Sequence, residues 1–281
     1  MATYRYVLCD VFTDRPLEGN QLAVFTDARG LGAETMQALA LETKLSESVF
    51  VLPPEQGGHA RIRIFTPTKE LQFAGHPTLG SAFVLGGPLQ LLEIRLETGA
   101  GIVPVRLERE GARIVFGRME QPLPTWKPFQ DTEELFAALG VEAAEAPVEV
   151  YDNGIRHSYV VLGSREQVAA LRPDFPRLAA ITETDCVSCF AGDGGEWKTR
   201  MFAPNSGVDE DPATGSAAGP LAVHLVRHGR IGFGDEIRIE QGAEIGRPSV
   251  LYAQVDGAGE SVERVEVGGS AVVVARGEFR L

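Results

Sequence analysis

The chain has 281 residues, of which 44% are hydrophobic, and carries a formal net charge of −13 at pH 7. This length allows one large domain or two medium ones, with enough core to fold without disulfides or metals. The acidic balance excludes nucleic acid and anionic membranes as expected partners, because both need basic patches. No stretch reaches the roughly 20 apolar residues of a membrane span, and the N-terminus lacks the apolar core of a signal peptide. We therefore expect a cytoplasmic protein that acts on a small molecule.

The three cysteines are Cys9, Cys186 and Cys189. An odd and low count argues against a secreted disulfide scaffold. Cys186 and Cys189 have C-x-x-C spacing, but Val187 and Phe190 are typical of a strand, and no second pair completes a zinc site. We therefore predict that the three thiols are buried in the core and take no part in catalysis or metal binding.

Strands dominate the predicted N-terminal half, with two helices among them. Residues 32–45 carry apolar side chains at helical spacing, and a second helix is expected after the glycine-rich segment 73–82. The expected strands, which are rich in β-branched residues or alternate in polarity, cover residues 4–12, 21–25, 49–52, 61–65, 92–97, 102–108 and 113–119.

The second half repeats this order loosely after the proline-rich residues 121–128, which we interpret as a linker. We expect two domains, residues 1–125 and 126–281, with the last strand able to cross back to the first domain. Mostly antiparallel strands with one central helix per half are expected, because neither βαβ alternation nor a G-x-G-x-x-G fingerprint is present. The pattern predicts an α+β protein. The expected strands of this half cover residues 148–151, 158–162, 186–191, 198–202, 237–241, 249–255, 262–267 and 271–275.

Two short glycine-rich segments are the most informative features of the chain. They read F-A-G-H-P-T-L-G-S-A at 73–82 and D-P-A-T-G-S-A-A-G at 211–219. Each combines turn residues with side chains that handle protons and then enters a run of small apolar residues, which is typical of a loop that leads into a buried helix. The first N–H groups of a helix are unpaired and carry partial positive charge, so they can hold an anion without a basic residue.

Glu47, His76 and Asp211 are the ionisable candidates for chemistry. Glu47 lies between two serines at a helix-to-strand corner, and its alternative reading is a solvated turn residue. His76 lies in a constrained Gly-His-Pro turn, and its alternative is a structural histidine bonded to backbone. Asp211 precedes a predicted helix, and its alternative is simple capping. The residues alone leave these alternatives open.

Two other patterns are weaker. His224 and His228 are spaced i, i+4 on an expected helix, but no H-E-x-x-H pattern and no third ligand is evident. We interpret His228 as a partner of the C-terminal helix dipole. Because the two histidines lack a third ligand in the sequence, we predict no metal site. Ser216 is not the centre of G-x-S-x-G, which disfavours a hydrolase.

Seven short motifs are spread along nearly the whole chain. They are D-V-F-T-D-R-P-L-x-G-N at 10–20, L-S-E-S at 45–48, R-I-F-T-P at 63–67, F-A-G-H-P at 73–77, R-M-F-A-P at 200–204, D-P-A-T-G-S-A-A-G-P-L at 211–221 and Q-G-x-E-I-G-R-P-S at 241–249. In these motifs the chain resembles the PhzF family of isomerases, which has the diaminopimelate-epimerase-like fold. The resemblance implies two pseudo-symmetric domains, each a curled antiparallel sheet around a central helix, with the active site between them. It also implies a homodimer without a cofactor or metal.

The implied reaction is isomerisation of trans-2,3-dihydro-3-hydroxyanthranilate to a reactive amino-ketone, 6-amino-5-oxocyclohex-2-ene-1-carboxylate, in phenazine biosynthesis. The alternatives are isomerisation of another cyclic or amino-acid-derived acid, and ligand binding without catalysis. A hydrogen shift along one face of a ring needs only one base, whereas inversion of a carbon needs two. The positions that hold cysteines in thiol-type relatives are here about Ala74 and Pro212.

By the same resemblance, Glu47 is the general acid/base, and His76 and Asp211 are its catalytic partners. The backbone at residues 75–76 and 215–216 is implied to cradle the substrate carboxylate. The residues implied to bind substrate are Asn20, Gly75, His76, Asp211, Gly215 and Ser216.

Overall fold

The computed structural model describes residues 2–281, which divide into two compact units. The first unit comprises the residues up to Glu120 together with Val267–Leu281, and the second comprises Gln121–Glu266. The division therefore falls at residues 120 and 121, where the sequence analysis places it at 125 and 126. The end of the chain belongs to the first unit.

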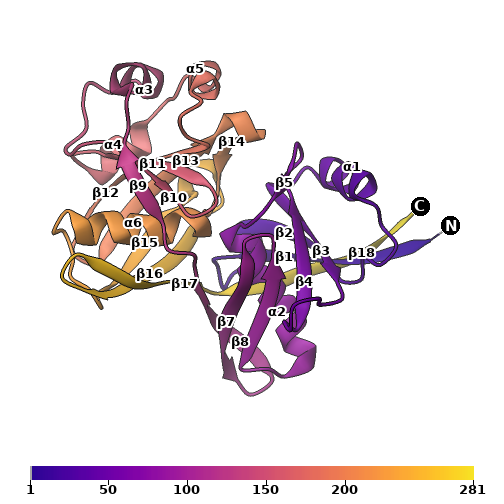
Figure 1. The fold of residues 1–281 in the computed structure, drawn as a ribbon. Coiled ribbons are helices and arrows are strands. Elements are labelled where there is room, and N and C mark those ends of the chain that lie inside the picture. Colours follow the sequence, from indigo (N-terminus) through magenta and orange to yellow (C-terminus); the bar gives the residue numbers. More distant parts are fainter. Residues whose placement is uncertain (1) are drawn as a thin grey trace. The chain divides into compact units, whose positions relative to one another are not determined.

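The first unit is built around one long helix, α2 (Figure 1), which packs against β1, β2, β6, β7 and β8. A further strand, β17 (Ser261–Gly269), runs from the second unit into the first. The elements of the first unit are β1 (Thr3–Val11), β2 (Asn20–Phe25), α1 (Ala33–Thr43), β3 (Glu47–Leu52), β4 (Ala60–Phe65), β5 (Glu70–Leu71), α2 (Gly75–Leu89), β6 (Glu93–Thr98), β7 (Gly101–Glu110), β8 (Arg113–Glu120) and β18 (Ala271–Arg280).

Helix α2 is buried along most of its length because its small residues let the sheet approach closely. A Cβ atom added to Gly80 would lie 2.7 Å from the side chains of both Leu22 and Val11. A Cβ atom on Gly86 would lie 2.5 Å from Leu107. Such close packing around the helix fixes the position of its first turn.

The second unit is built in the same way around α6 (Figure 1), which packs against β11 and β16. Its elements are β9 (Thr125–Pro128), α3 (Thr132–Leu139), β10 (Glu149–Asp152), β11 (Arg156–Val161), α4 (Arg165–Ala170), α5 (Phe175–Ala180), β12 (Cys186–Asp193), β13 (Glu196–Ala203), the 3₁₀ turn η1 (Pro204–Ser206), β14 (Val208–Asp211), α6 (Gly215–Arg227), β15 (Glu236–Gln241), the 3₁₀ turn η2 (Ala243–Ile245) and β16 (Ser249–Ala258).

The α+β class is confirmed, and most strand pairs are antiparallel as predicted, with four parallel pairs as exceptions. Strands β2 and β3, and β4 and β6, are parallel in the first unit. Strands β11 and β12, and β13 and β15, are parallel in the second unit. Each parallel pair is joined by a segment that contains a helix, which is how a parallel connection is usually made. The sheets are therefore mixed.

Residues 125–128 form β9 rather than part of a linker. This strand pairs antiparallel with β10, and its four residues are exposed. Pro128 is its last residue, and proline is tolerated on a strand that needs no further ladder donor. Gln121, in the same proline-rich stretch, is buried. The proline-rich residues therefore form an edge strand and the segment that precedes it, rather than a linker throughout.

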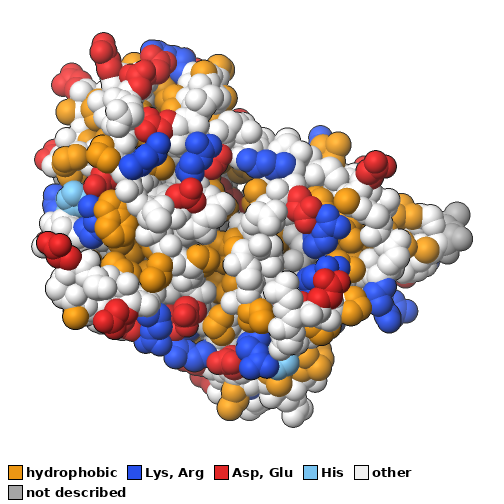
Figure 2. All heavy atoms as spheres, in the orientation of Figure 1, with side chains coloured by type: hydrophobic (Ala, Val, Ile, Leu, Met, Phe, Trp, Pro, Cys, Tyr) orange, Lys and Arg blue, Asp and Glu red, His pale blue; other side chains and the backbone are white. Residues whose placement is uncertain are grey.

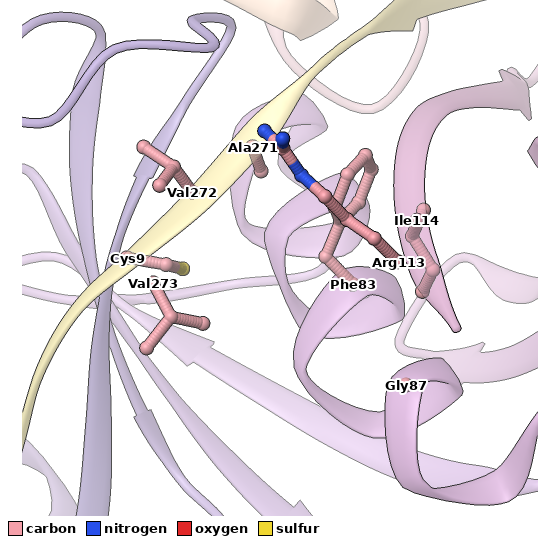
Figure 3. Close-up of a pocket in the computed structure, with 8 residues that line it drawn as sticks. All are labelled: Cys9, Phe83, Gly87, Arg113, Ile114, Ala271, Val272 and Val273. Carbon is pink, nitrogen blue, oxygen red and sulfur yellow. The ribbon is translucent and has the colours of Figure 1, made fainter. Parts of the chain in front are cut away.

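The three cysteines are buried free thiols, as predicted. Cys186 and Cys189 lie in β12, and Cys9 lines a hollow between α2, β8 and β18 (Figure 3). Burial raises the pKa of the Cys9 and Cys189 thiols. Because the thiolate is the nucleophilic form, neither thiol is suited to catalysis at neutral pH.

The two ends of the described chain lie side by side (Figure 1). Strand β18 pairs antiparallel with β1 along nearly its full length. Just beyond the strands, the N–H of Ala2 donates to the carbonyl of Leu281 at 2.7 Å, and the N–H of Leu281 donates back at 3.0 Å. The sheet of the first unit therefore contains both the first and the last strand of the chain.

The visible surface carries charges of both signs close together. On the face shown in Figure 2, Lys and Arg side chains are interspersed with Asp and Glu side chains. Ion pairs such as Arg63–Glu70 at 2.6 Å and Arg177–Glu134 at 2.8 Å neutralise part of the basic charge. In the described part of the chain, every helix is too short or too polar to cross a bilayer.

Candidate active site

The first unit brings together four of the predicted site residues, Asn20, Glu47, Gly75 and His76, which we call the Glu47 half-site. Asn20 and Glu47 are the first residues of β2 and β3. These strands are parallel neighbours, so both begin at the same edge of the sheet. Gly75 and His76 open α2. The half-site thus lies near the start of two strands and a helix.

The side chains of the Glu47 half-site contact one another. His76 Nε2 lies 3.5 Å from Glu47 Oε2, and Asn20 Nδ2 lies 3.1 Å from His76 Nδ1. The side chains of His76 and Glu47 are only 4% and 15% exposed. Glu47 is therefore an enclosed carboxyl beside an imidazole, and not a solvated turn residue.

His76 is uncharged at neutral pH. Burial lowers the pKa of His76 from 6.5 to about 3, partly opposed by a hydrogen bond with the backbone of Gln21. Its contact with Glu47 is consequently not an ion pair, although the distance would permit one. A neutral imidazole offers one N–H donor and one lone pair, so His76 is suited to orienting its neighbours rather than to donating a proton as imidazolium.

The start of α2 is open to an anion. Its N-cap residue, Ala74, is extended and makes no side-chain capping bond, and the first turn contains no acidic residue. The first N–H groups of a helix have no partner within it. Those of Gly75 and His76 can therefore face a bound carboxylate, which the helix dipole also favours.

The second unit contains the other predicted residues, Asp211, Gly215 and Ser216, which we call the Asp211 half-site. Asp211 is the buried last residue of β14, and Thr214 is the N-cap residue of α6. The Thr214 hydroxyl donates to Asp211 Oδ2 at 2.6 Å, and the side chain of the N-cap residue Thr214 makes no capping bond to α6. The first turn of α6 also lacks acidic residues.

Gln241, which the sequence analysis missed as a site residue, holds this turn from β15. Its Nε2 donates to the carbonyl oxygen of Asp211 at 2.8 Å and to Thr214 Oγ1 at 2.9 Å. Its Oε1 accepts from the N–H of Thr214 at 3.2 Å. Because an amide nitrogen can only donate, the Thr214 hydroxyl proton is left to point at the Asp211 carboxyl. The sequence gives one signal for Gln241, which is the first residue of the motif Q-G-x-E-I-G-R-P-S at 241–249.

Two further amide side chains that the sequence analysis missed fix the first residues of α6. Gln121 Nε2 donates to the carbonyl of Gly215 at 2.7 Å, and Asn153 Nδ2 donates to the carbonyl of Ser216 at 2.9 Å. All four residues are buried. The N–H groups at the start of this helix are therefore held in place by groups outside it.

The sequence shows no third donor near His224 and His228. In the structure, Glu149 of β10 lies beside these two residues of α6. The donor atoms of the three residues all lie within 4.8 Å of one another. Glu149 is 75 residues from His224 in sequence, so spacing could not reveal it.

Each unit therefore has a central helix whose first turn lies beside an ionisable side chain. Solved structures with this fold include a hydroxyproline epimerase from Agrobacterium vitis, at a TM-score of 0.69 and 15% identity, covering 99% of this chain and 91% of that one. At that identity the likeness shows the fold alone. The fold is the diaminopimelate-epimerase-like α+β fold.

The model of the PhzC-PhzF family, described as phenazine biosynthesis-like protein, matches residues 9–277, and the chain belongs to this family. It is 52% identical over 278 residues to a Pseudomonas aeruginosa protein named trans-2,3-dihydro-3-hydroxyanthranilate isomerase, covering 99% of this chain and 100% of the relative. A solved PhzF-family phenazine biosynthesis protein from Bacillus anthracis superposes with a TM-score of 0.87 at 26% identity, over 100% of both chains. The family predicted from the motifs is confirmed.

Proposed function

We propose that this protein isomerises trans-2,3-dihydro-3-hydroxyanthranilate to 6-amino-5-oxocyclohex-2-ene-1-carboxylate, without a cofactor, as a step of phenazine biosynthesis. The observation that carries the proposal is the 52% identity, over 99% of the chain, with the Pseudomonas aeruginosa enzyme named for this substrate. The enclosed Glu47 carboxyl beside a neutral His76 supplies a group able to move a proton.

Glu47 is the proposed proton carrier. Its carboxylate takes the proton from C3, the ring carbon that bears the hydroxyl, and returns it to another ring carbon on the same face. The electron pair of the broken C–H bond enters the ring π system, and C3 becomes the carbon of an enol that relaxes to the ketone. The reaction is redox-neutral, and because the proton leaves and returns on one face of the ring, a single positioned acid/base is sufficient.

The substrate carboxylate is assigned to main-chain N–H groups. Residues 75–76 and 215–216 open two helices whose N-cap residues make no side-chain capping bond and whose first turns contain no acidic residue. An anion held there gains the partial positive charge of the helix end. This arrangement suits an anionic substrate in a protein with a formal net charge of −13.

The remaining predicted residues position the reacting groups. His76, held by Asn20, orients the Glu47 carboxyl. Asp211 and Ser216 are proposed to bind the polar substituents of the ring. Asp211 already receives the Thr214 hydroxyl at 2.6 Å, so its carboxyl has a fixed orientation.

The decisive experiment replaces Glu47 with Gln and measures turnover of the dihydro-hydroxyanthranilate. Loss of a general acid/base should lower kcat by about 10²–10⁴-fold, whereas Glu42→Gln, at an exposed carboxyl on α1, should leave kcat unchanged. Retained binding of 3-hydroxyanthranilate, a stable look-alike, would show that the variant is folded. Turnover of Glu47→Gln at the wild-type rate would remove Glu47 from the mechanism.

We further propose that the protein acts in the cytoplasm as a homodimer, which the family resemblance supports. Light scattering coupled to size-exclusion chromatography would give the mass directly. One chain has a mass of 30.2 kDa. A species of the single-chain mass at working concentration would contradict the dimer.

A further inference from the structure

A cluster of metal-ligating side chains lies in the second unit, outside both half-sites. His224 and His228 are one turn apart on α6, and Glu149 begins β10. Glu149 Oε2 lies 3.0 Å from His228 Nε2 and 3.4 Å from His224 Nδ1. With a helical rise of 1.5 Å per residue, His224 lies about 14 Å along α6 from Gly215, so the cluster is separate from the start of this helix.

A buried nitrogen in this cluster lacks a hydrogen bond. His224 is 2% exposed, and its Nδ1 has no well-aligned hydrogen bond among the described residues, although Glu149 Oε2 lies 3.4 Å away. A buried polar atom without a partner is costly and calls for an explanation. Since Nδ1 lies 3.4 Å from the Glu149 carboxylate, a ligand placed between the two groups would satisfy it.

The imidazole of His224 is held in a fixed orientation by aromatic rings. Tyr159 stacks on it with centroids 5.8 Å apart, and the rings of Tyr151 and Phe190 approach at 5.7 and 5.6 Å with steep interplanar angles. Metal sites depend on such support, because surrounding contacts fix the orientation of the ligands. The donor is therefore pre-organised.

The distances within the cluster suit a small tetrahedral ion. Ligand atoms about 2.0–2.2 Å from Zn²⁺ in tetrahedral geometry lie about 3.3–3.6 Å from one another. The measured separations of 3.0 and 3.4 Å from Glu149 Oε2 are close to this range. Two imidazole nitrogens and one carboxylate oxygen are also a ligand set that zinc accepts. His228 is 27% exposed, which leaves room for water as a fourth ligand.

One cation already shares the carboxylate. Arg227 Nη1 lies 2.8 Å from Glu149 Oε2, and Tyr151 donates to the same oxygen at 2.8 Å. The Arg227 guanidinium also lies 4.3 Å from the ring centroid of Trp126. A metal ion at Glu149 would compete with Arg227, whose side chain could keep its place on the Trp126 ring.

We propose that Glu149, His224 and His228 form a Zn²⁺ site that joins β10 to the end of α6 in competition with Arg227. The ion stabilises the second unit and takes no part in the isomerisation. The proposal rests on residues of one unit and is independent of the proposed function.

Calorimetric titration of chelator-treated protein with zinc chloride tests this proposal. We expect one Zn²⁺ per chain and a zinc-dependent rise in the melting temperature. His228→Ala should weaken binding by at least about tenfold, while His59→Ala, at an exposed histidine of the first unit, should not change it. Arg227→Gln should tighten binding, because it removes the competing cation.

Several outcomes would overturn the site. These are no saturable binding to the wild-type protein, equal binding by His228→Ala, or weaker binding by Arg227→Gln. Cobalt substitution adds a spectroscopic readout, since four-coordinate Co²⁺ with two imidazoles should give visible absorption bands that His228→Ala loses. His228→Ala should retain wild-type isomerase turnover, which separates this test from that of the proposed function.

Discussion

The neutral state of His76 decides which group of the Glu47 half-site can carry a proton. Burial lowers the pKa of His76 to about 3, so the imidazole stays uncharged from about pH 4 upward. An imidazolium is therefore not available as a general acid near neutrality. Glu47, 3.5 Å away, is left as the ionisable group of this half-site, and the role proposed for the imidazole is to hold the carboxyl in place.

This assignment predicts a specific pH dependence for His76→Gln. Loss of the imidazole should misplace the carboxyl and lower kcat/KM by about 10²-fold. The acid limb of the kcat/KM profile should keep its midpoint, because His76 does not titrate between pH 5 and 8 in the native protein. The measurement is the pH-rate profile of both proteins. A wild-type limb near pH 6.5 that disappears in the variant would show that His76 itself titrates there.

The sequence predicted some site residues and not others for identifiable reasons. Glu47, His76 and Asp211 lie in short motifs, so their neighbours signal them. Gln121 lies in a proline-rich stretch, and its bond to the Gly215 carbonyl depends on the fold of the second unit. Long-range contacts of this kind leave no local pattern in a single sequence.

Among the elements of the second unit, the turn after β15 is packed against the segment that leads into α6. Gly242 has a φ of +79°, and a Cβ atom there would lie 2.4 Å from the carbonyl oxygens of Pro212 and Arg247. Gly246 has a similar φ of +72° but no heavy atom within 4 Å. The two glycines therefore share a backbone requirement and differ only in the space around them.

The pair of substitutions Gly242→Ala and Gly246→Ala separates these effects. Both should cost about 1–2 kcal/mol of unfolding free energy for the left-handed conformation. Gly242→Ala should cost about 1–3 kcal/mol more through overpacking, and it should lower kcat/KM because Pro212 follows Asp211. Urea unfolding and steady-state kinetics measure the two quantities. Equal losses in both variants would mean that Pro212 moves aside with no further loss of stability or kcat/KM.

The order of helices and strands was largely predictable, whereas the parallel direction of four strand pairs was not. Alternating apolar residues indicate that a segment such as β4 is a strand, but they do not show whether it pairs parallel or antiparallel with its neighbour. The parallel pairing of β4 with β6 is set by the crossover through α2, which is a property of the whole unit. Residues 125–128 were misread for a related reason, since proline signals both edge strands and linkers.

In the whole molecule, the second unit is inserted between two parts of the first. Strand β18 follows the entire second unit in sequence and pairs with β1 of the first. Tyr6, Phe25 and Phe279 join the two ends through rings 5.5–5.7 Å apart. The stability of the first unit should therefore depend on the last residues of the chain.

Deleting Ala271–Leu281 tests this dependence. We expect the first unit to lose protection in hydrogen-exchange mass spectrometry, because β1 loses its partner, while residues 121–266 keep theirs. Deleting residues 280–281 alone should have little effect, since most of the β1–β18 register remains. Full protection of the first unit in the longer deletion would show that β18 is dispensable.

The pairing of β1 with β18 also determines the order in which the two units can fold during synthesis on the ribosome. The nascent N-terminal strand must wait until the whole inserted unit has been translated before its partner emerges. The inserted unit is by then already outside the exit tunnel and free to form its own core. The unit that contains Glu47 should consequently mature last, so a chain terminated before β18 would release a folded second unit attached to an unfinished first one.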